Sequence, residues 1–162
     1  MSPQRLLFVC LGNICRSPAA EGVFLHLLAR EGLAEQFVVD SAGTGSWHVG
    51  KPADRRMLAA AEKRGIVLPS RARQIEAADL GRFDRILTMD NDNLAAVEAL
   101  ARQGRPAPGT EQALIEPITR HCRRFRSQEV PDPYYGGEEG FEQVLDLLED
   151  ACGGLLDQLK SR

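Results

Sequence analysis

The stretch LLFVCLGNICRSPAAEG, residues Leu6–Gly22, decides the fold of this chain. Its first five residues are an apolar run that ends at a glycine-containing loop, which is typical of a buried strand. Pro18 stands where the first turn of a helix accepts proline, and apolar residues then recur at helical spacing up to Gly32. The stretch therefore predicts a strand, a tight loop and a helix in immediate succession.

The rest of the chain continues this alternation. Further strands are predicted at residues 37–45 (FVVDSAGTG), at residues 83–90 (FDRILTMD) and around Leu114–Ile118. Further helices are predicted at residues 53–65, 91–104 and 139–162, the last with a weak point at Gly153–Gly154. Because the strands are apolar throughout, we expect one α/β domain over residues 1–162, with a mostly parallel sheet covered on both faces.

Composition limits the classes of function. The 162 residues are 43% apolar and 27% charged, which is typical of a globular chain, and the net charge of −3 disfavours wholesale nucleic-acid binding. No apolar run approaches the roughly 20 residues that span a bilayer, and the first ten residues lack the core of a signal peptide. We therefore expect a cytoplasmic protein that binds neither nucleic acid nor a membrane. We also expect a monomer, although nothing in the composition decides this.

Neither the cysteines nor the histidines form a metal-binding pattern. The four cysteines lack paired C-x-x-C spacing, and His26, His48 and His121 are scattered. Cys122 and Cys152 are interpreted as buried or half-buried apolar residues. We expect no metal and no cofactor.

The loop between the first strand and helix has the chemistry of an anion site. Backbone N–H groups at a helix N-terminus converge on one point, Gly12 relieves crowding in the curl, and Arg16 adds a planar fork of donors. Cys10 at the base of the curl would be held as a thiolate, with Ser17 as its hydrogen-bond donor and Asn13 tying the loop together. The alternative is a chance C-x5-R pattern with Cys10 as an ordinary core residue.

Displacement of phosphate also needs a proton for the leaving oxygen. VPDPYYGG supplies Asp132, whose direction is fixed by the prolines on either side, with Tyr134 and Tyr135 as wall material. The alternative is an ordinary Pro-Asp-Pro turn with surface tyrosines.

These motifs resemble the low-molecular-weight protein tyrosine phosphatases. The resemblance rests on VCLGNICRSPAAEG and VPDPYYGG, and on DSAGT, WHVGKPADRR, RARQI and FDRILTMDNDN in the same order and spacing. It implies a flavodoxin-like three-layer α/β/α fold with a four-stranded parallel sheet. It also implies metal-independent hydrolysis of phosphotyrosine in proteins through a phosphocysteine intermediate.

The resemblance assigns roles to individual residues. Cys10 would be the nucleophile, Arg16 would bind phosphate, and Asp132 would be the general acid and then the general base. The phosphate-binding loop would also comprise Leu11, Gly12, Asn13, Ile14, Cys15 and Ser17.

Other residues would support the site. Ser41 would hold the loop asparagine, and Trp47 and Tyr134 would be walls for the substrate ring. Cys15 would form a reversible disulfide with Cys10. Asp90 closes a strand on the expected active edge, where it would support the loop or the acid. Many relatives have a histidine at the position of Ser70, so the support from that position is expected to differ.

Three alternatives remain open. Arsenate reductases share the loop but use two further cysteines after the third strand, where residues 79–100 contain none. Protein arginine phosphatases have threonine at the position of Ile14, and the larger apolar residue suits an aromatic substrate better. A non-catalytic anion-binding module would lack the nucleophile or the acid, and both are present.

Overall fold

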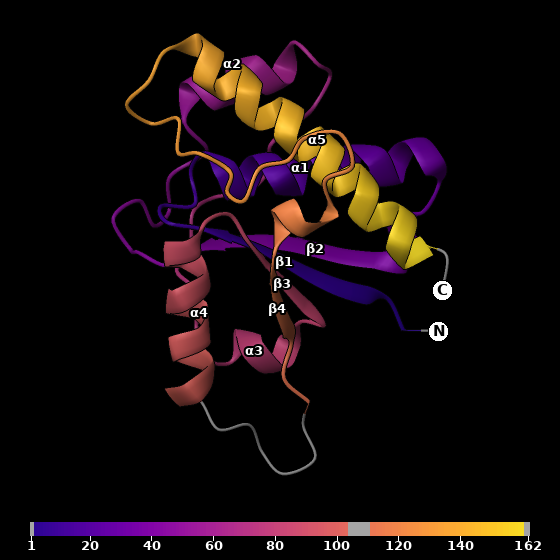
Figure 1. Ribbon diagram of the computed structural model, residues 1–162, viewed down its shortest axis with the longest axis vertical. Coiled ribbons are helices and arrows are strands. Elements are labelled where there is room, and N and C mark those ends of the chain that lie inside the picture. Colours follow the sequence, from indigo (N-terminus) through magenta and orange to yellow (C-terminus); the bar gives the residue numbers. More distant parts are fainter. Residues whose placement is uncertain (1, 104–110, 161–162) are drawn as a thin grey trace.

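The computed structural model describes residues 2–103 and 111–160. Its sheet has four strands in the order β2-β1-β3-β4, and all three pairings are parallel (Figure 1). The strands are β1 (Gln4–Cys10), β2 (Phe37–Gly43), β3 (Arg85–Thr88) and β4 (Leu114–Pro117). The flavodoxin-like parallel sheet that the sequence predicts is therefore confirmed.

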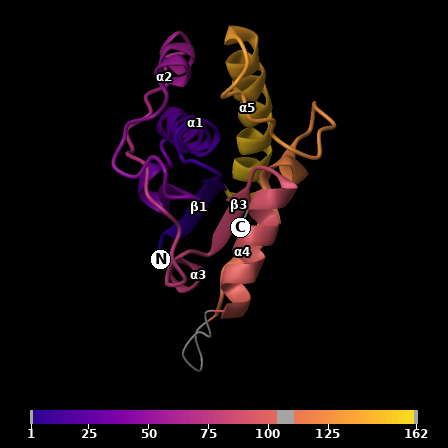
Figure 2. The same ribbon diagram turned by 90° about the vertical axis from the view of Figure 1, so that its left-hand side faces the viewer.

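Helices cover both faces of the sheet (Figures 1 and 2). One face carries α1 (Arg16–Glu31) and α5 (Glu138–Lys160), with α2 (Arg55–Glu62) packed against α5, and the other carries α3 (Asp79–Arg82) and α4 (Asn91–Gln103). Two short 3-10 helices, η1 (Ala34–Gln36) and η2 (Ile118–His121), complete the described elements. Alternate residues of β1 enter separate cores, Leu6 and Phe8 on the α1–α5 side and Leu7 and Val9 on the other.

Several element boundaries differ from the sequence-based prediction. β1 begins earlier, at Gln4, α2 is shorter, and α3 was not predicted. α5 runs through the predicted weak point at Gly153–Gly154 without a break. A Cβ at Gly154 would lie 2.0 Å from the carbonyl O of His121, so this glycine lets η2 pack closely against α5. The predicted helix end at Gly104 and residues 161–162 lie outside the described residues.

The order of the strands puts the loop that follows β1 at the point in the sheet where ligands usually bind. Because β2 and β3 lie on opposite sides of β1, the chain connections diverge there, and ligands bind at the carboxyl ends of strands at such a point. Cys10, the last residue of β1, is opposite Gly43, the last residue of β2. Among the described residues, no helix combines the length and apolar character needed to cross a membrane.

Candidate active site

The loop from Cys10 to Arg16 curls closely against the end of β2. The N–H groups of Thr44 and Gly45 donate to the carbonyl oxygens of Cys10 and Leu11, both at 2.9 Å. A Cβ on Gly43 would lie 2.7 Å from the Leu11 carbonyl O, so glycine permits this approach. The curl brings two hydrogen-bond partners to the Cys10 sulfur. The Asn13 N–H donates to Sγ at 3.3 Å, and the Ser17 hydroxyl lies 3.0 Å from Sγ, where it can donate to a thiolate.

Asn13 is the structural centre of the loop. Its φ of 57° is in the left-handed region, which asparagine tolerates better than most residues. Its side chain is buried and donates through Nδ2 to Ser17 Oγ at 2.7 Å and to Ser41 Oγ at 3.0 Å. Its Oδ1 accepts the backbone N–H of Arg73 at 3.0 Å. These bonds hold the strained backbone, and they place Ser41 beside the loop asparagine.

Arg16, the first residue of α1, connects the loop to two other segments. Its side chain is 3% exposed, and Nη1 donates to Asp90 Oδ2 at 2.7 Å and to the Val130 carbonyl O at 3.0 Å. Nη2 lies 3.7 Å from Asp132 Oδ2. Burial would lower the pKa of Arg16, but the neighbouring Cys10 and Asp90 outweigh it and raise the pKa.

Asp132 lies within the loop between η2 and α5, which is anchored to the residue after β3 and to the start of α4. The Val130 N–H donates to the Met89 carbonyl O at 2.7 Å, and Glu129 Oε2 accepts the N–H of Asn91 at 2.7 Å. Asp132 Oδ1 accepts the N–H of Tyr134 at 3.1 Å, and its side chain is 43% exposed. The carboxylate therefore has a fixed backbone partner and access to solvent.

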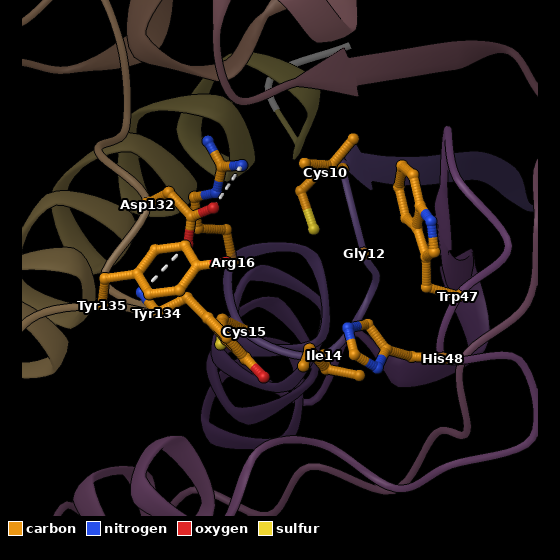
Figure 3. Close-up of a pocket in the computed structure, with 11 residues that line it drawn as sticks. Cys10, Gly12, Ile14, Cys15, Arg16, Trp47, His48, Asp132, Tyr134 and Tyr135 are labelled. Carbon is orange, nitrogen blue, oxygen red and sulfur yellow. Dashed lines mark hydrogen bonds and ion pairs between the residues drawn. The ribbon is translucent and has the colours of Figure 1, made fainter.

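These groups surround a cavity of about 420 Å³. Figure 3 shows the Cys10 sulfur pointing into it, with Arg16, Asp132 and Tyr134 on one side and Trp47 and His48 on the other. The lining residues are Cys10, Leu11, Gly12, Ile14, Cys15, Arg16, Trp47, His48, Asp132, Tyr134 and Tyr135. The structure thus brings ten of the predicted residues to one cavity, all of its lining residues except His48. Asn13, Ser17 and Ser41 are buried beneath the cavity, and Asp90 is bonded to Arg16.

The walls of the cavity are aromatic. Trp47 is 69% exposed at the rim, and the ring centroids of Tyr134 and His48 lie 6.2 Å apart. Arg56 of α2 fixes the position of Tyr134. Its guanidinium lies 5.5 Å from the centroid of the tyrosine ring and donates to the Tyr134 carbonyl O at 2.8 Å. Such walls suit a flat aromatic group above the sulfur.

Sequence reasoning missed two residues of this region. His48 lines the cavity although it belongs to no metal-like pattern, and its position next to Trp47 was the available signal. Glu21 of α1 accepts a hydrogen bond from Ser41 at 2.6 Å, and nothing in the local sequence distinguishes it from an ordinary helix glutamate.

The second thiol of the loop, that of Cys15, lies in surroundings that keep it protonated. Burial raises the pKa of the Cys15 thiol, and the nearby carboxylates of Asp54 and Asp132 and the Cys10 sulfur raise it further. Cys15 is therefore a neutral thiol at physiological pH, and both cysteines are free. Within the described ranges, no three His, Cys, Asp or Glu side chains are grouped so that they could hold a metal ion.

Comparison with known proteins agrees with this geometry. The family model of the low molecular weight phosphotyrosine protein phosphatases matches residues 5–162. A phosphatase of that description from Schizosaccharomyces pombe is 41% identical over 156 residues, which cover 96% of each chain. The crystal structure of a protein tyrosine phosphatase from Entamoeba histolytica, with Hepes in the active site, matches with a TM-score of 0.88 and 42% identity. That match covers 98% of this chain and 97% of the other.

A third match concerns a different substrate. A Drosophila arginine phosphatase structure has a TM-score of 0.88 at 32% identity, covering 96% of this chain and 97% of the other. The fold, the site and the matched relatives together define an enzyme, a protein-tyrosine phosphatase that hydrolyses phosphoric monoesters. More particularly, the chain belongs to the low molecular weight phosphotyrosine protein phosphatase family.

Proposed function

We propose that residues 1–162 act as one phosphatase domain that hydrolyses phosphotyrosine in proteins through a phosphocysteine on Cys10. The observation that carries the proposal is the position of the Cys10 sulfur, which points into the cavity opposite Arg16 and Asp132 (Figure 3). A phosphate above the sulfur would meet the guanidinium of Arg16 and the N–H groups of the loop, including those of Leu11, Gly12 and Ile14.

In the first step the Cys10 thiolate attacks phosphorus, so that an S–P bond forms as the P–O bond to the tyrosine breaks. Asp132 gives a proton to the leaving oxygen. Arg16 compensates the charge that spreads over the phosphoryl oxygens. Its bond to Asp90 keeps the guanidinium aimed at the same point.

In the second step the Asp132 carboxylate takes a proton from water, which attacks phosphorus and breaks the S–P bond. The thiolate that leaves is the better leaving group because Ser17 and the Asn13 N–H donate to it. Cys15, a neutral thiol, does not compete as the nucleophile.

The rival substrate is phosphoarginine, since a structural neighbour is an arginine phosphatase. Ile14, Trp47 and Tyr134 favour an aromatic group, because together they offer the cavity apolar and aromatic surface. We therefore propose that phosphotyrosine is preferred, which a comparison of kcat/KM for the two phosphoamino acids in one peptide would test.

Two variants test the mechanism. Cys10→Ser should lower kcat for p-nitrophenyl phosphate by roughly 10⁴-fold or more, as expected on loss of a nucleophile. Asp132→Ala should slow aryl phosphates with poor leaving groups far more than those with good ones. Equal losses across the leaving groups would remove Asp132 from the role of general acid, and retained turnover in Cys10→Ser would remove the phosphocysteine.

A further inference from the structure

The segment that carries Asp132 is hydrogen-bonded to other parts of the molecule on both sides of the carboxylate. Before Asp132, the Val130 carbonyl O accepts a hydrogen bond from Arg16 at 3.0 Å. After it, the Tyr134 carbonyl O accepts one from Arg56 Nη2 at 2.8 Å. The Tyr134 N–H in turn donates to Asp132 Oδ1 at 3.1 Å, so the position of residue 134 affects the direction of the carboxylate.

Arg56 holds the second half of this segment. In the part of the chain that the structure describes, it is the one residue, apart from the proposed acid itself, whose side chain hydrogen-bonds to the backbone of residues 133–137. Its guanidinium also reaches the Gly136 carbonyl O, through Nη1 at 3.5 Å. The guanidinium carbon lies 5.5 Å from the centroid of the Tyr134 ring and 4.7 Å from that of the buried Phe141 ring. Two carbonyls and two rings therefore contact one guanidinium.

The plane of this guanidinium is fixed by Asp54, the residue that caps α2. Arg56 Nε donates to Asp54 Oδ1 at 3.1 Å, and Nη2 donates to Oδ2 at 3.0 Å, so the pair is bidentate. The Asp54 side chain is 12% exposed and also accepts the backbone N–H of Arg56 at 2.8 Å. A bidentate pair fixes direction as well as distance, which the single ammonium of a lysine cannot reproduce.

Asp54 connects this arrangement to the phosphate loop, because its backbone N–H donates to the Ile14 carbonyl O at 2.8 Å. A path of hydrogen bonds therefore runs from the phosphate loop through Asp54 and Arg56 to the residues that follow Asp132. The bond from Arg16 is the corresponding path to the residues before it. Asp132 thus lies between two points that are each fixed relative to the phosphate loop.

We propose that Arg56 is a positioning residue for the proton transfer, which holds Asp132 within reach of the leaving oxygen. The proposal rests on the proposed function of Asp132 as general acid. A general acid contributes about 10²- to 10⁴-fold to the rate and must lie within hydrogen-bond distance of the oxygen that it protonates. A displacement of about 1 Å can cost about a hundredfold. Loss of the Arg56 fork should therefore slow the proton transfer, although Arg56 does not line the cavity.

The test compares kcat/KM for two aryl phosphates in Arg56→Lys, which keeps the charge and removes the fork. Phenol needs a proton in order to leave far more than p-nitrophenol does. We expect kcat/KM for phenyl phosphate to fall about tenfold and that for p-nitrophenyl phosphate to stay within about threefold. Because both substrates place a ring against Tyr134, a change in that wall alone would lower the two values equally.

Three further variants isolate the proton transfer. In an Asp132→Ala background, Arg56→Lys should lower kcat/KM for phenyl phosphate by less than about threefold, because no acid is left to position. Asp54→Asn keeps a residue that can cap α2 but removes the charged bidentate partner, so it should also slow phenyl phosphate more than p-nitrophenyl phosphate. The matched control is Arg55→Lys at the exposed neighbouring position, which should leave both values unchanged.

Unchanged kcat/KM in Arg56→Lys, or equal losses for the two aryl phosphates, would overturn the proposal. So would a loss of the full size in the Asp132→Ala background. If Arg56→Lys does not fold, equal losses in Asp54→Asn would overturn it. Failure of the proposed function is recognised separately, because Asp132→Ala would then itself show no dependence on the leaving group.

Discussion

Arg16 and Asp90 form a partly buried ion pair in which the arginine Nη1 lies 2.7 Å from the aspartate Oδ2. The same nitrogen donates to the Val130 carbonyl O, so one atom joins the phosphate loop, the end of β3 and the loop that carries Asp132. These bonds hold Arg16, the proposed phosphate-binding residue, at a fixed distance from Asp132, the proposed general acid. Neither α1 nor the loop that carries Asp132 could fix that distance alone.

Asp90→Asn should lower kcat/KM for aryl phosphates by about tenfold to a hundredfold, because a charge-assisted bond that orients Arg16 is lost. The matched control is Asp92→Asn, an exposed carboxylate two residues away. Steady-state kinetics of both variants would check this, and an equal effect of the two substitutions would show that only net charge matters.

Trp47→Ala should raise KM for phosphotyrosine peptides several-fold, since stacking on a partly exposed ring contributes roughly 1 kcal/mol. The substitution should leave hydrolysis of a small alkyl phosphate nearly unchanged. Val49→Ala is the control, since Val49 is another exposed apolar residue that does not line the cavity. The same loss for aryl and alkyl phosphates would contradict a ring-binding wall.

Mild peroxide should convert the Cys10 thiolate to a sulfenic acid, which the Cys15 sulfur then attacks to give a disulfide and water. Because the pKa of Cys15 is raised, this closure should be faster at higher pH. Peptide mass spectrometry should find the Cys10–Cys15 bridge in the parent protein and sulfinic acid at Cys10 in Cys15→Ser. Cys122→Ser should behave as the parent, and sulfinic acid alone in the parent would contradict the bridge.

Asp150→Asn should lower the free energy of unfolding by about 2 kcal/mol at pH 7, because this carboxylate accepts the N–H groups of Arg123, Arg124 and Phe125. Burial would raise the pKa of Asp150, but these bonds outweigh it and lower the pKa. Because the pKa is lower in the folded state, the carboxylate stabilises the protein at pH values above the unfolded-state pKa of about 3.9. This stabilisation is lost as the pH falls through the folded-state pKa. Urea titrations should therefore show the gap between variant and parent shrinking below about pH 4, and a constant gap would contradict it.

Local sequence was enough to predict the centre of this site. Cys10, Arg16 and Ser17 lie within one strand–loop–helix unit, so chain connectivity alone brings them together. The chemistry that the reaction needs predicts Asp132, the resemblance predicts Trp47, and both line the same cavity. The order of the strands then explains why loops so far apart in the sequence meet there.

What was missed depends on contacts between distant segments. The hydrogen bond from Ser41 to Glu21 spans β2 and α1, and that from Arg16 to Val130 spans more than a hundred residues. Neither leaves a periodic or compositional signal. The continuity of α5 through Gly153–Gly154 is likewise set by the packing of η2, which outweighs the low helix propensity of glycine.

The most direct test of the phosphocysteine is its capture. In Asp132→Ala, a substrate with a good leaving group such as p-nitrophenyl phosphate can still phosphorylate the enzyme, but the base for the second step is missing. Acid quenching within the first turnovers, followed by peptide mass spectrometry, should find one phosphoryl group on Cys10. A phosphoryl group on another residue, or product formation with an unmodified Cys10 throughout, would contradict the account.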